Sequence, residues 1–238
     1  MDQLLKGILH RSPHRITLRR HSGQKQEFLI RRCEEDDFDD IMALQRKICE
    51  EVGDPEIYSL VGEEEIKESL KLDHCFGVYL EGRPAGASAG PVEESCPAGT
   101  SAGPAEDAEP AAMDSAPRLV AFTVMIDNRI SHRNYGSYVG YSPEQQARCV
   151  SMEITVVDEP CRGYGMQKLF VYLREGVALH QGAAEAMVTI GPDNKYSLNN
   201  LLESGYEIID TRPLYEGAMR HILRKRLKEE THRIGHRP

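Results

Sequence analysis

Residues 150–166 join an apolar segment to a turn with two glycines, and this combination could bind an anion. The letters VSMEITVV at 150–157 alternate apolar and polar side chains, which predicts a β-strand. The turn RGYG at 162–165 then opens a segment whose apolar residues recur at helical spacing. Backbone N–H groups at a helix start favour negative charge, and glycine lets a phosphate come close. The pattern predicts a diphosphate site; the alternative is an ordinary strand-to-helix turn.

A second segment, DNKYSLNNLLESGYEI at 193–208, reads as a helix that ends at a glycine before another strand. Together the two segments resemble the acetyl-CoA-binding motifs of the GCN5-related N-acetyltransferase (GNAT) superfamily. The resemblance is good over residues 119–226 and loose over 27–80.

The first family motif is Q/R-x-x-G-x-G/A, in which Arg162 and Gly165 fit and Gln167 departs from the expected Gly or Ala. A second register places Gly163 and Gly165 on the two glycines, with Pro160 as the departure. The family's second motif, N-x-x-S/A followed by G-F/Y, is matched by Asn194, Ser197, Gly205 and Tyr206.

The resemblance implies an α+β fold with a mixed, mostly antiparallel central sheet, flanked by helices, in which a splayed strand pair holds an acyl-CoA. The implied co-substrate is acetyl-CoA, and the implied acceptor is a primary amine of a small molecule, an amino acid or a protein. The family binds the diphosphate through backbone N–H groups of the turn and pairs the pantetheine arm with the splayed strand. The implied coenzyme contacts are Thr155, Val156 and Val157 for pantetheine, Arg162, Gly163, Tyr164, Gly165, Met166, Gln167 and Lys168 for the diphosphate, and Asn194 and Ser197 for the same arm.

Glu153, in the middle of the predicted strand, is the candidate base that removes the proton from the attacking ammonium. A carboxylate among apolar neighbours is expected to have a raised pKa, which suits that role. The alternative is a strand-edge glutamate that faces solvent or pairs with an arginine. The proton donor to the CoA thiolate stays open, because Leu201 stands where many family members have a tyrosine and Tyr196 lies on another helix face.

Three tyrosines, Tyr135, Tyr138 and Tyr141, lie among glycines in the polar segment 127–147. Tyrosine offers flat contact area and a hydroxyl, so these side chains could line a substrate cleft and supply a proton. Equally, they could anchor a surface loop.

The rest of the sequence predicts the strands and helices that position these residues. Apolar periodicity predicts strands at 27–33, 76–80, 119–126, 186–190, 206–210 and 218–223, and helices at 38–52, 63–72, 166–177 and 194–204. These elements make one domain over residues 27–226.

Three segments lie outside this pattern. Residues 1–26 carry six basic side chains and one acid, which predicts a basic flexible arm or a segment that folds back on the acidic body. Residues 84–117 hold ten Ala, six Pro, four Gly and four Ser, which predicts a disordered insertion between two strands. Residues 227–238 read as a charged tail.

Composition narrows the function classes. The chain has 238 residues and a net charge of −9, which argues against a nucleic-acid partner. No apolar run is long enough to span a membrane, and six scattered cysteines without an export signal predict reduced thiols and a cytoplasmic location. No metal site is expected, because the three histidines of the arm have no Cys or acidic ligand beside them. The chain is expected to be a monomer or homodimer.

The leading hypothesis is an N-acyltransferase. A catalytically silent acyl-CoA-binding module is the alternative, favoured by Gln167 in the turn and Leu201 at the tyrosine position. A dinucleotide-binding α/β protein is disfavoured, since the full G-x-G-x-x-G pattern is missing.

Overall fold

The computed structural model describes residues 2–54, 57, 58, 60–81, 117–127 and 134–228. The expected insertion at 84–117 lies outside these residues except for its last position, and the expected tail lies outside them from residue 229 on. The helices are α1 (Asp2–Leu9), α2 (Phe38–Val52), α3 (Glu63–Lys71), α4 (Pro143–Gln146), α5 (Met166–His180) and α6 (Lys195–Glu203). The strands are β1 (His14–Arg19), β2 (Lys25–Arg32), β3 (Cys75–Leu80), β4 (Arg118–Asp127), β5 (Cys149–Val157), β6 (Glu185–Ile190), β7 (Glu207–Leu214) and β8 (Ala218–Arg226).

All eight strands form one sheet in the order β1-β2-β3-β4-β5-β6-β8-β7. Every neighbouring pair is antiparallel except β5 and β6, which run parallel because α5 crosses from the end of one to the start of the other. The expected α+β architecture with a mixed, mostly antiparallel sheet is therefore confirmed.

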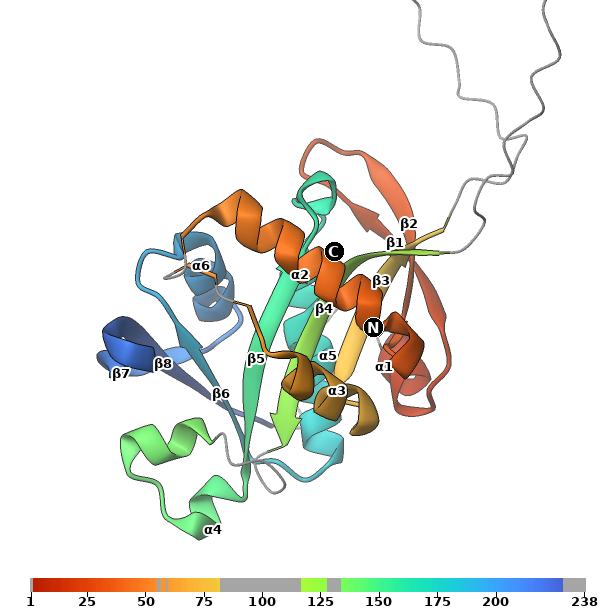
Figure 1. The fold of residues 1–238 in the computed structure, drawn as a ribbon. Coiled ribbons are helices and arrows are strands. Elements are labelled where there is room, and N and C mark those ends of the chain that lie inside the picture. The colour runs from red at the N-terminus through yellow and green to blue at the C-terminus, as the bar shows by residue number, and fades with distance from the viewer. Residues whose placement is uncertain (1, 55–56, 59, 82–116, 128–133, 229–238) are drawn as a thin grey trace, which may run out of the picture.

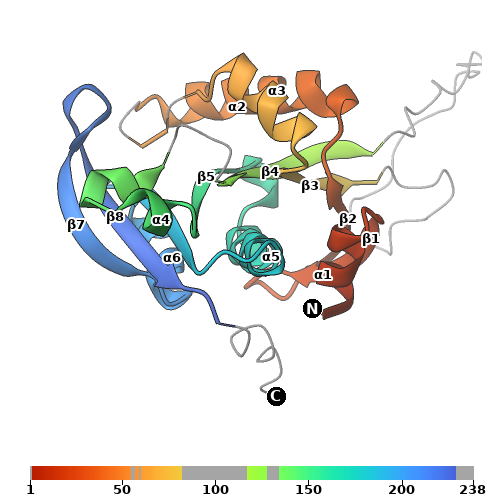
Figure 2. The ribbon, with the colours of Figure 1, turned by 90° about the horizontal axis from the view of Figure 1, so that it is seen from below.

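Helices cover both faces of the sheet, as Figure 1 and Figure 2 show: α2 and α3 lie on one face, and α1 and α5 lie on the other. The helical periodicity explains this arrangement, because each helix buries one apolar stripe. Ile41 and Ile48 of α2 pack with Phe122 of β4, and Phe170 of α5 packs with Met152 of β5 on the opposite face. The strands between the two layers are accordingly apolar on both sides.

The prediction of a flexible arm over residues 1–26 is wrong. Leu4 and Ile8 of α1 are buried in the core beside α5, and β1 pairs with β2 in an antiparallel hairpin. Arg15 and Arg19 lie on the exposed side of β1, and Arg15 binds Glu81, the residue after β3, at 2.7 Å. The second expectation, that this basic segment folds back on an acidic body, describes the structure.

Strands β5 and β6 are paired only at their beginnings. The parallel ladder joins residues 149–151 to residues 185–187, although β5 continues to Val157 and β6 to Ile190. Beyond Ser151 the two strands diverge, and the V between them is visible in Figure 1. In the described chain no other strand pairs with this edge of β5, so its outward backbone groups are not used in a second strand ladder. The Val157 carbonyl at its end accepts from Arg162 at 3.3 Å. This is the splayed pair expected from the sequence.

A β-bulge lies in the diverging part of β5. Thr123 of β4 pairs with Thr155, whereas Met125 pairs with Met152, so two steps along β4 correspond to three along β5. The buried Thr123 hydroxyl donates to the carbonyl of Ile154 at 2.7 Å and fixes this irregularity. A bulge re-aims the side chains beside it, and Glu153 is one of them.

Candidate active site

The turn between β5 and α5 presents a row of backbone N–H groups. Gly163 and Gly165 have φ values of 87° and 75°, in the left-handed region that glycine adopts without strain. Among the described residues, no acceptor hydrogen bonds to the amides of residues 163–168; the next amide, that of Leu169, donates to Gly165 O at 3.1 Å. A Cβ at Gly165 would meet no atom within 4 Å. The turn therefore combines amides without an acceptor in the described chain, open space beside Gly165 and the dipole of α5, which together suit an anion.

One amide of this turn departs from the sequence prediction, and two of its side chains face inward, which leaves their predicted backbone role open. The amide of Arg162 donates to Glu159 O at 3.1 Å, so it is not available to a ligand. The side chains of Tyr164 and Met166 are buried in the core, where Tyr164 makes an edge contact with Phe28. Only the backbone of these two residues faces outward.

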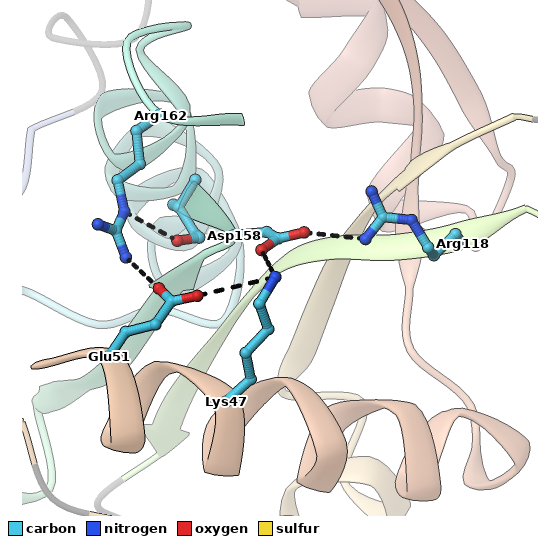
Figure 3. A network of polar contacts seen from close by, with 6 residues as sticks. Lys47, Glu51, Arg118, Asp158 and Arg162 are labelled. Atoms are coloured by element: carbon cyan, nitrogen blue, oxygen red, sulfur yellow. Dashed lines mark hydrogen bonds and ion pairs between the residues drawn. The ribbon is translucent and has the colours of Figure 1, made fainter. Parts of the chain in front are cut away.

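An ion-pair network fixes the end of β5 just before the turn (Figure 3). The buried carboxylate of Asp158 accepts from Lys47 of α2 at 2.5 Å and from Arg118 of β4 at 2.9 Å. Arg162 extends the network, because its guanidinium donates to Glu51 of α2 at 3.2 Å and to the Val157 carbonyl at 3.3 Å. The turn is thereby tied to α2 and β4.

The pKa of Asp158 reflects this arrangement. Burial by itself would raise it, but the hydrogen bonds from Arg118 and Lys47 outweigh burial and hold the pKa below its usual value. Sequence spacing gives no sign of this network, because the partners of Asp158 are 40 and 111 residues away along the chain.

Gln167, the departure from the family motif, connects the two matched segments. Its side-chain amide donates to Ser197 Oγ of α6 at 2.5 Å and accepts from Asn200 at 2.7 Å. Asn194 is the N-cap of α6 and accepts from the Ser197 amide at 3.3 Å. The structure thus brings together the turn and the helix that the sequence linked only by order. The side-chain oxygens of Asn194 and Ser197 are already engaged in these bonds.

Glu153 lies half-buried at the bulge and interacts with Tyr135 and Tyr215, which come from two other segments. Burial, followed by the charge of Glu153 and hydrogen bonds with Glu153 and Tyr215, raises the pKa of Tyr135 well above its usual value. Tyr135 therefore keeps its proton at neutral pH. Tyr138 stacks on Tyr135 with ring centroids 6.0 Å apart and meets Tyr215 edge-on at 6.5 Å. We call Glu153, Tyr135, Tyr138 and Tyr215 the tyrosine cluster.

Tyr215 was missed by the sequence analysis. It lies between β7 and β8 with a φ of 46°, a strained value for a residue with a Cβ. Its hydroxyl bonds Thr189 of β6 at 3.0 Å, which places it across the V from β5. Tyr215 is far from Glu153 in the sequence, so its place beside that residue could not be predicted from the sequence. The letters Tyr-Glu-Gly at 215–217 indicate only a turn.

Three other predicted or considered residues lie apart from this cluster. Tyr141 donates its hydroxyl to Glu185 at 2.8 Å and accepts from Arg224 at 3.1 Å, so it supports the start of β6. Leu201 is buried in the core and offers no proton. Tyr196 is almost fully exposed.

A cavity of about 410 Å³ lies beside the turn rather than beside Glu153. It is bounded by α1, β1 and the first turn of α5, and His14, Thr17, Gly165 and Lys168 are among its lining residues. The N-terminal segment is therefore a wall of the region around the turn.

Solved structures share this arrangement over most of the chain. A GNAT-family acetyltransferase from Listeria monocytogenes is 13% identical, covers 90% of this chain and 100% of its own, and has a TM-score of 0.57. The chain has the GNAT fold.

Two other structures with the GNAT fold carry the coenzyme. A NatC complex bound to Gag peptide and CoA is 12% identical, with 84% of this chain and 99% of that chain covered and a TM-score of 0.53. The yncA protein of Salmonella typhimurium, solved with its cofactor acetyl-CoA, is 11% identical, with 85% and 95% covered and a TM-score of 0.52. No protein-family model and no curated protein matches the sequence.

Within the described ranges, no helix combines the length and apolarity needed to cross a bilayer. The same residues contain no group of three or more His, Cys, Asp or Glu side chains suited to a metal ion.

Proposed function

We propose that the chain is a GNAT-superfamily N-acetyltransferase that moves an acetyl or similar acyl group from acetyl-CoA to a primary amine of a small molecule, an amino acid or a protein. The observation that carries this proposal is the row of amides at residues 163–168 without an acceptor in the described chain, next to the open edge of β5. A diphosphate would accept hydrogen bonds from these amides, and a pantetheine arm would pair with the open edge of β5.

The coenzyme would lie across both features. Its diphosphate oxygens accept from the turn amides, where the dipole of α5 adds favourable potential. Its pantetheine amides pair with the edge of β5 over Thr155, Val156 and Val157, as an added strand would. Lys168, beside the cavity, supplies a cation at the same end, although its Nζ also lies 2.5 Å from Glu203.

The proposed chemistry takes place at the tyrosine cluster. Glu153 accepts the proton of the attacking ammonium, directly or through water, so that the neutral amine attacks the thioester carbonyl. Tyr135, whose pKa is raised and whose hydroxyl bonds Glu153, orients this carboxylate. The carbonyl–sulfur bond then breaks, and the CoA thiolate takes up a proton from water or from a hydroxyl of the cluster. Binding in this geometry supplies most of the acceleration, because it replaces a bimolecular encounter.

The acceptor faces Glu153 from the side of Tyr135, Tyr138 and Tyr215. Flat aromatic walls with hydroxyl groups suit a short amine-bearing chain. A cytoplasmic site of action is part of this proposal, supported by the five described cysteines, all of which are free thiols.

A silent acyl-CoA-binding module is the second candidate, favoured by the buried Leu201 at the usual tyrosine position. Release of free thiol from acetyl-CoA, measured with a panel of small amines, amino acids and peptides, separates the two. We expect amine-dependent thiol release. Tight CoA binding without release for any acceptor class would instead support the module.

A further inference from the structure

The side chain of Arg20, from the N-terminal hairpin, reaches the carbonyl side of the phosphate turn. Its Nε donates to Arg162 O at 3.0 Å, and its Nη2 donates to Pro160 O. Its aliphatic part lies against Gly163, where an added Cβ would come within 3.3 Å of Arg20 Cγ. One guanidinium therefore binds two carbonyls on one side of the turn, and the free amides of the turn lie on the opposite side.

Peptide geometry gives these bonds a consequence. In a trans peptide the C=O and N–H groups point in opposite directions. Fixing the Arg162 carbonyl toward Arg20 directs the Gly163 N–H, the first available amide of the turn, away from it. Likewise, fixing the Pro160 carbonyl directs the Cys161 N–H, which donates to Asp158 O at 2.8 Å. Glycine at 163 is flexible on its own, so an external constraint is needed to hold this orientation.

Arg20 is itself held in place. It begins the turn of the β1–β2 hairpin, where its amide donates to Gln24 O at 2.8 Å and its carbonyl accepts from Gly23 at 2.9 Å. Its guanidinium also lies 5.0 Å from the ring centroid of Tyr164, a cation–π distance. A side chain with fixed ends loses little entropy when it binds the turn.

We propose that Arg20 is a positioning residue for the diphosphate: it orients the turn amides before the coenzyme arrives, and it makes the N-terminal hairpin part of the coenzyme site. This inference rests on the proposed function, since it requires that the turn bind CoA. The carbonyls of residues 160 and 162 remain between Arg20 and the anion, so Arg20 acts through the peptide groups rather than by contact.

The test compares Arg20→Ala with Arg19→Ala in the full chain. Arg19 is the adjacent residue, is exposed and is of the same type, which makes it the matched control. Calorimetric titration with CoA should show affinity weakened roughly tenfold or more for Arg20→Ala, and unchanged for Arg19→Ala. Arg20→Lys should recover only part of the lost affinity, because one ammonium cannot bind both carbonyls as the planar guanidinium does.

Two further readouts separate positioning from a general structural role. Steady-state kinetics should give a raised KM for acetyl-CoA with kcat at saturation nearly unchanged. Titration with 3′-dephospho-CoA should show that Arg20→Ala weakens its affinity by the same factor as that of CoA, because both molecules carry the diphosphate. Turnover of S-acetylpantetheine, which lacks it, should be equal in wild type and Arg20→Ala.

Each other outcome contradicts the inference. Equal CoA affinity in a folded Arg20→Ala variant overturns it. A loss seen with CoA but not with 3′-dephospho-CoA assigns Arg20 to direct contact with the 3′-phosphate instead. A lower kcat at unchanged KM would mean that the hairpin only stabilises the fold. If the wild-type protein binds no CoA, both the proposed function and this inference are wrong. If the wild-type protein binds CoA and Arg20→Ala binds it equally well, only this inference is wrong.

Discussion

Single residues decide the chemistry of the proposed reaction, and Glu153 is the most informative of them. It lies at the bulge of β5, against the protonated Tyr135 and across the V from Tyr215. The bulge explains how a strand residue between two buried neighbours turns toward Tyr135 and Tyr215 instead of a helix layer.

Replacing Glu153 with glutamine tests the assigned base. We expect kcat to fall by roughly 10²–10⁴ at neutral pH, with the KM for acetyl-CoA little changed, because glutamine fills the same volume but accepts no proton. The deficit should shrink as the pH approaches the pKa of the amine, about 8 for an α-amine and about 10 for a lysine-type amine, where solvent removes the proton. Steady-state rates from pH 7 to pH 10 provide the measurement, and a variant with wild-type kcat at pH 7 would exclude Glu153 as the base.

At the scale of elements, the network around Asp158 joins α2, β4 and the phosphate turn. Its carboxylate has a lowered pKa in the folded chain. A lowered folded pKa contributes stability above the unfolded value, which is about 4, and this stability is lost as the pH falls through the folded value.

Asp158→Asn should therefore lower the free energy of unfolding by about 1–3 kcal/mol at pH 7, since its partners Lys47 and Arg118 are half-exposed. The difference from wild type should begin to shrink as the pH falls below about 4, and it should vanish once the pH lies below the folded pKa of Asp158. Urea unfolding at both pH values measures it, with the exposed neighbour Glu159→Gln as the control. A destabilisation that persisted unchanged at low pH would show that the charge is not its cause.

Sequence patterns predicted the elements that are periodic and long. The strand and the helix around the turn could be predicted because apolar residues recur every second residue in β5 and at helical spacing in α5. The nearly continuous apolar run of β4 likewise indicated that the sheet is buried on both faces. What sequence reasoning could not place are contacts between distant segments: Asp158 with Lys47, Tyr215 with the β5 side, and Arg20 with the turn.

The N-terminal hairpin was misread for a different reason. Ile16 and Leu18 alternate with Arg15, Thr17 and Arg19, which is a strand pattern, but the basic charge was given more weight. On an amphipathic strand those charges occupy the exposed face and do not oppose folding.

At the scale of the whole molecule, the expected insertion interrupts a hairpin whose two strands are paired up to its open end. Leu80 at the end of β3 pairs with Arg118 at the start of β4. Because these ends are already adjacent, the connection between them is not needed to bring them together.

Replacing residues 82–116 with Asn-Gly leaves a connection of roughly four residues, a length that antiparallel hairpins use. It retains Glu81 and Arg118, which bind Arg15 and Asp158. We expect the midpoint of thermal unfolding and kcat/KM to stay near the wild-type values. Lost turnover in a variant that still unfolds cooperatively would assign the replaced segment to the catalytic machinery.

The central claim is that the amides of residues 163–168 bind the diphosphate of CoA, and one calorimetric comparison tests it most directly. Gly165→Val is titrated with acetyl-CoA beside Gly182→Val. Both glycines flank α5 with left-handed φ values, 75° and 83°, and a Cβ at either meets nothing within 4 Å, so the backbone strain is matched. We predict that Gly165→Val loses affinity by roughly a hundredfold or more, because its side chain occupies the phosphate's approach, while Gly182→Val binds as wild type does. Equal binding by both variants would contradict the account.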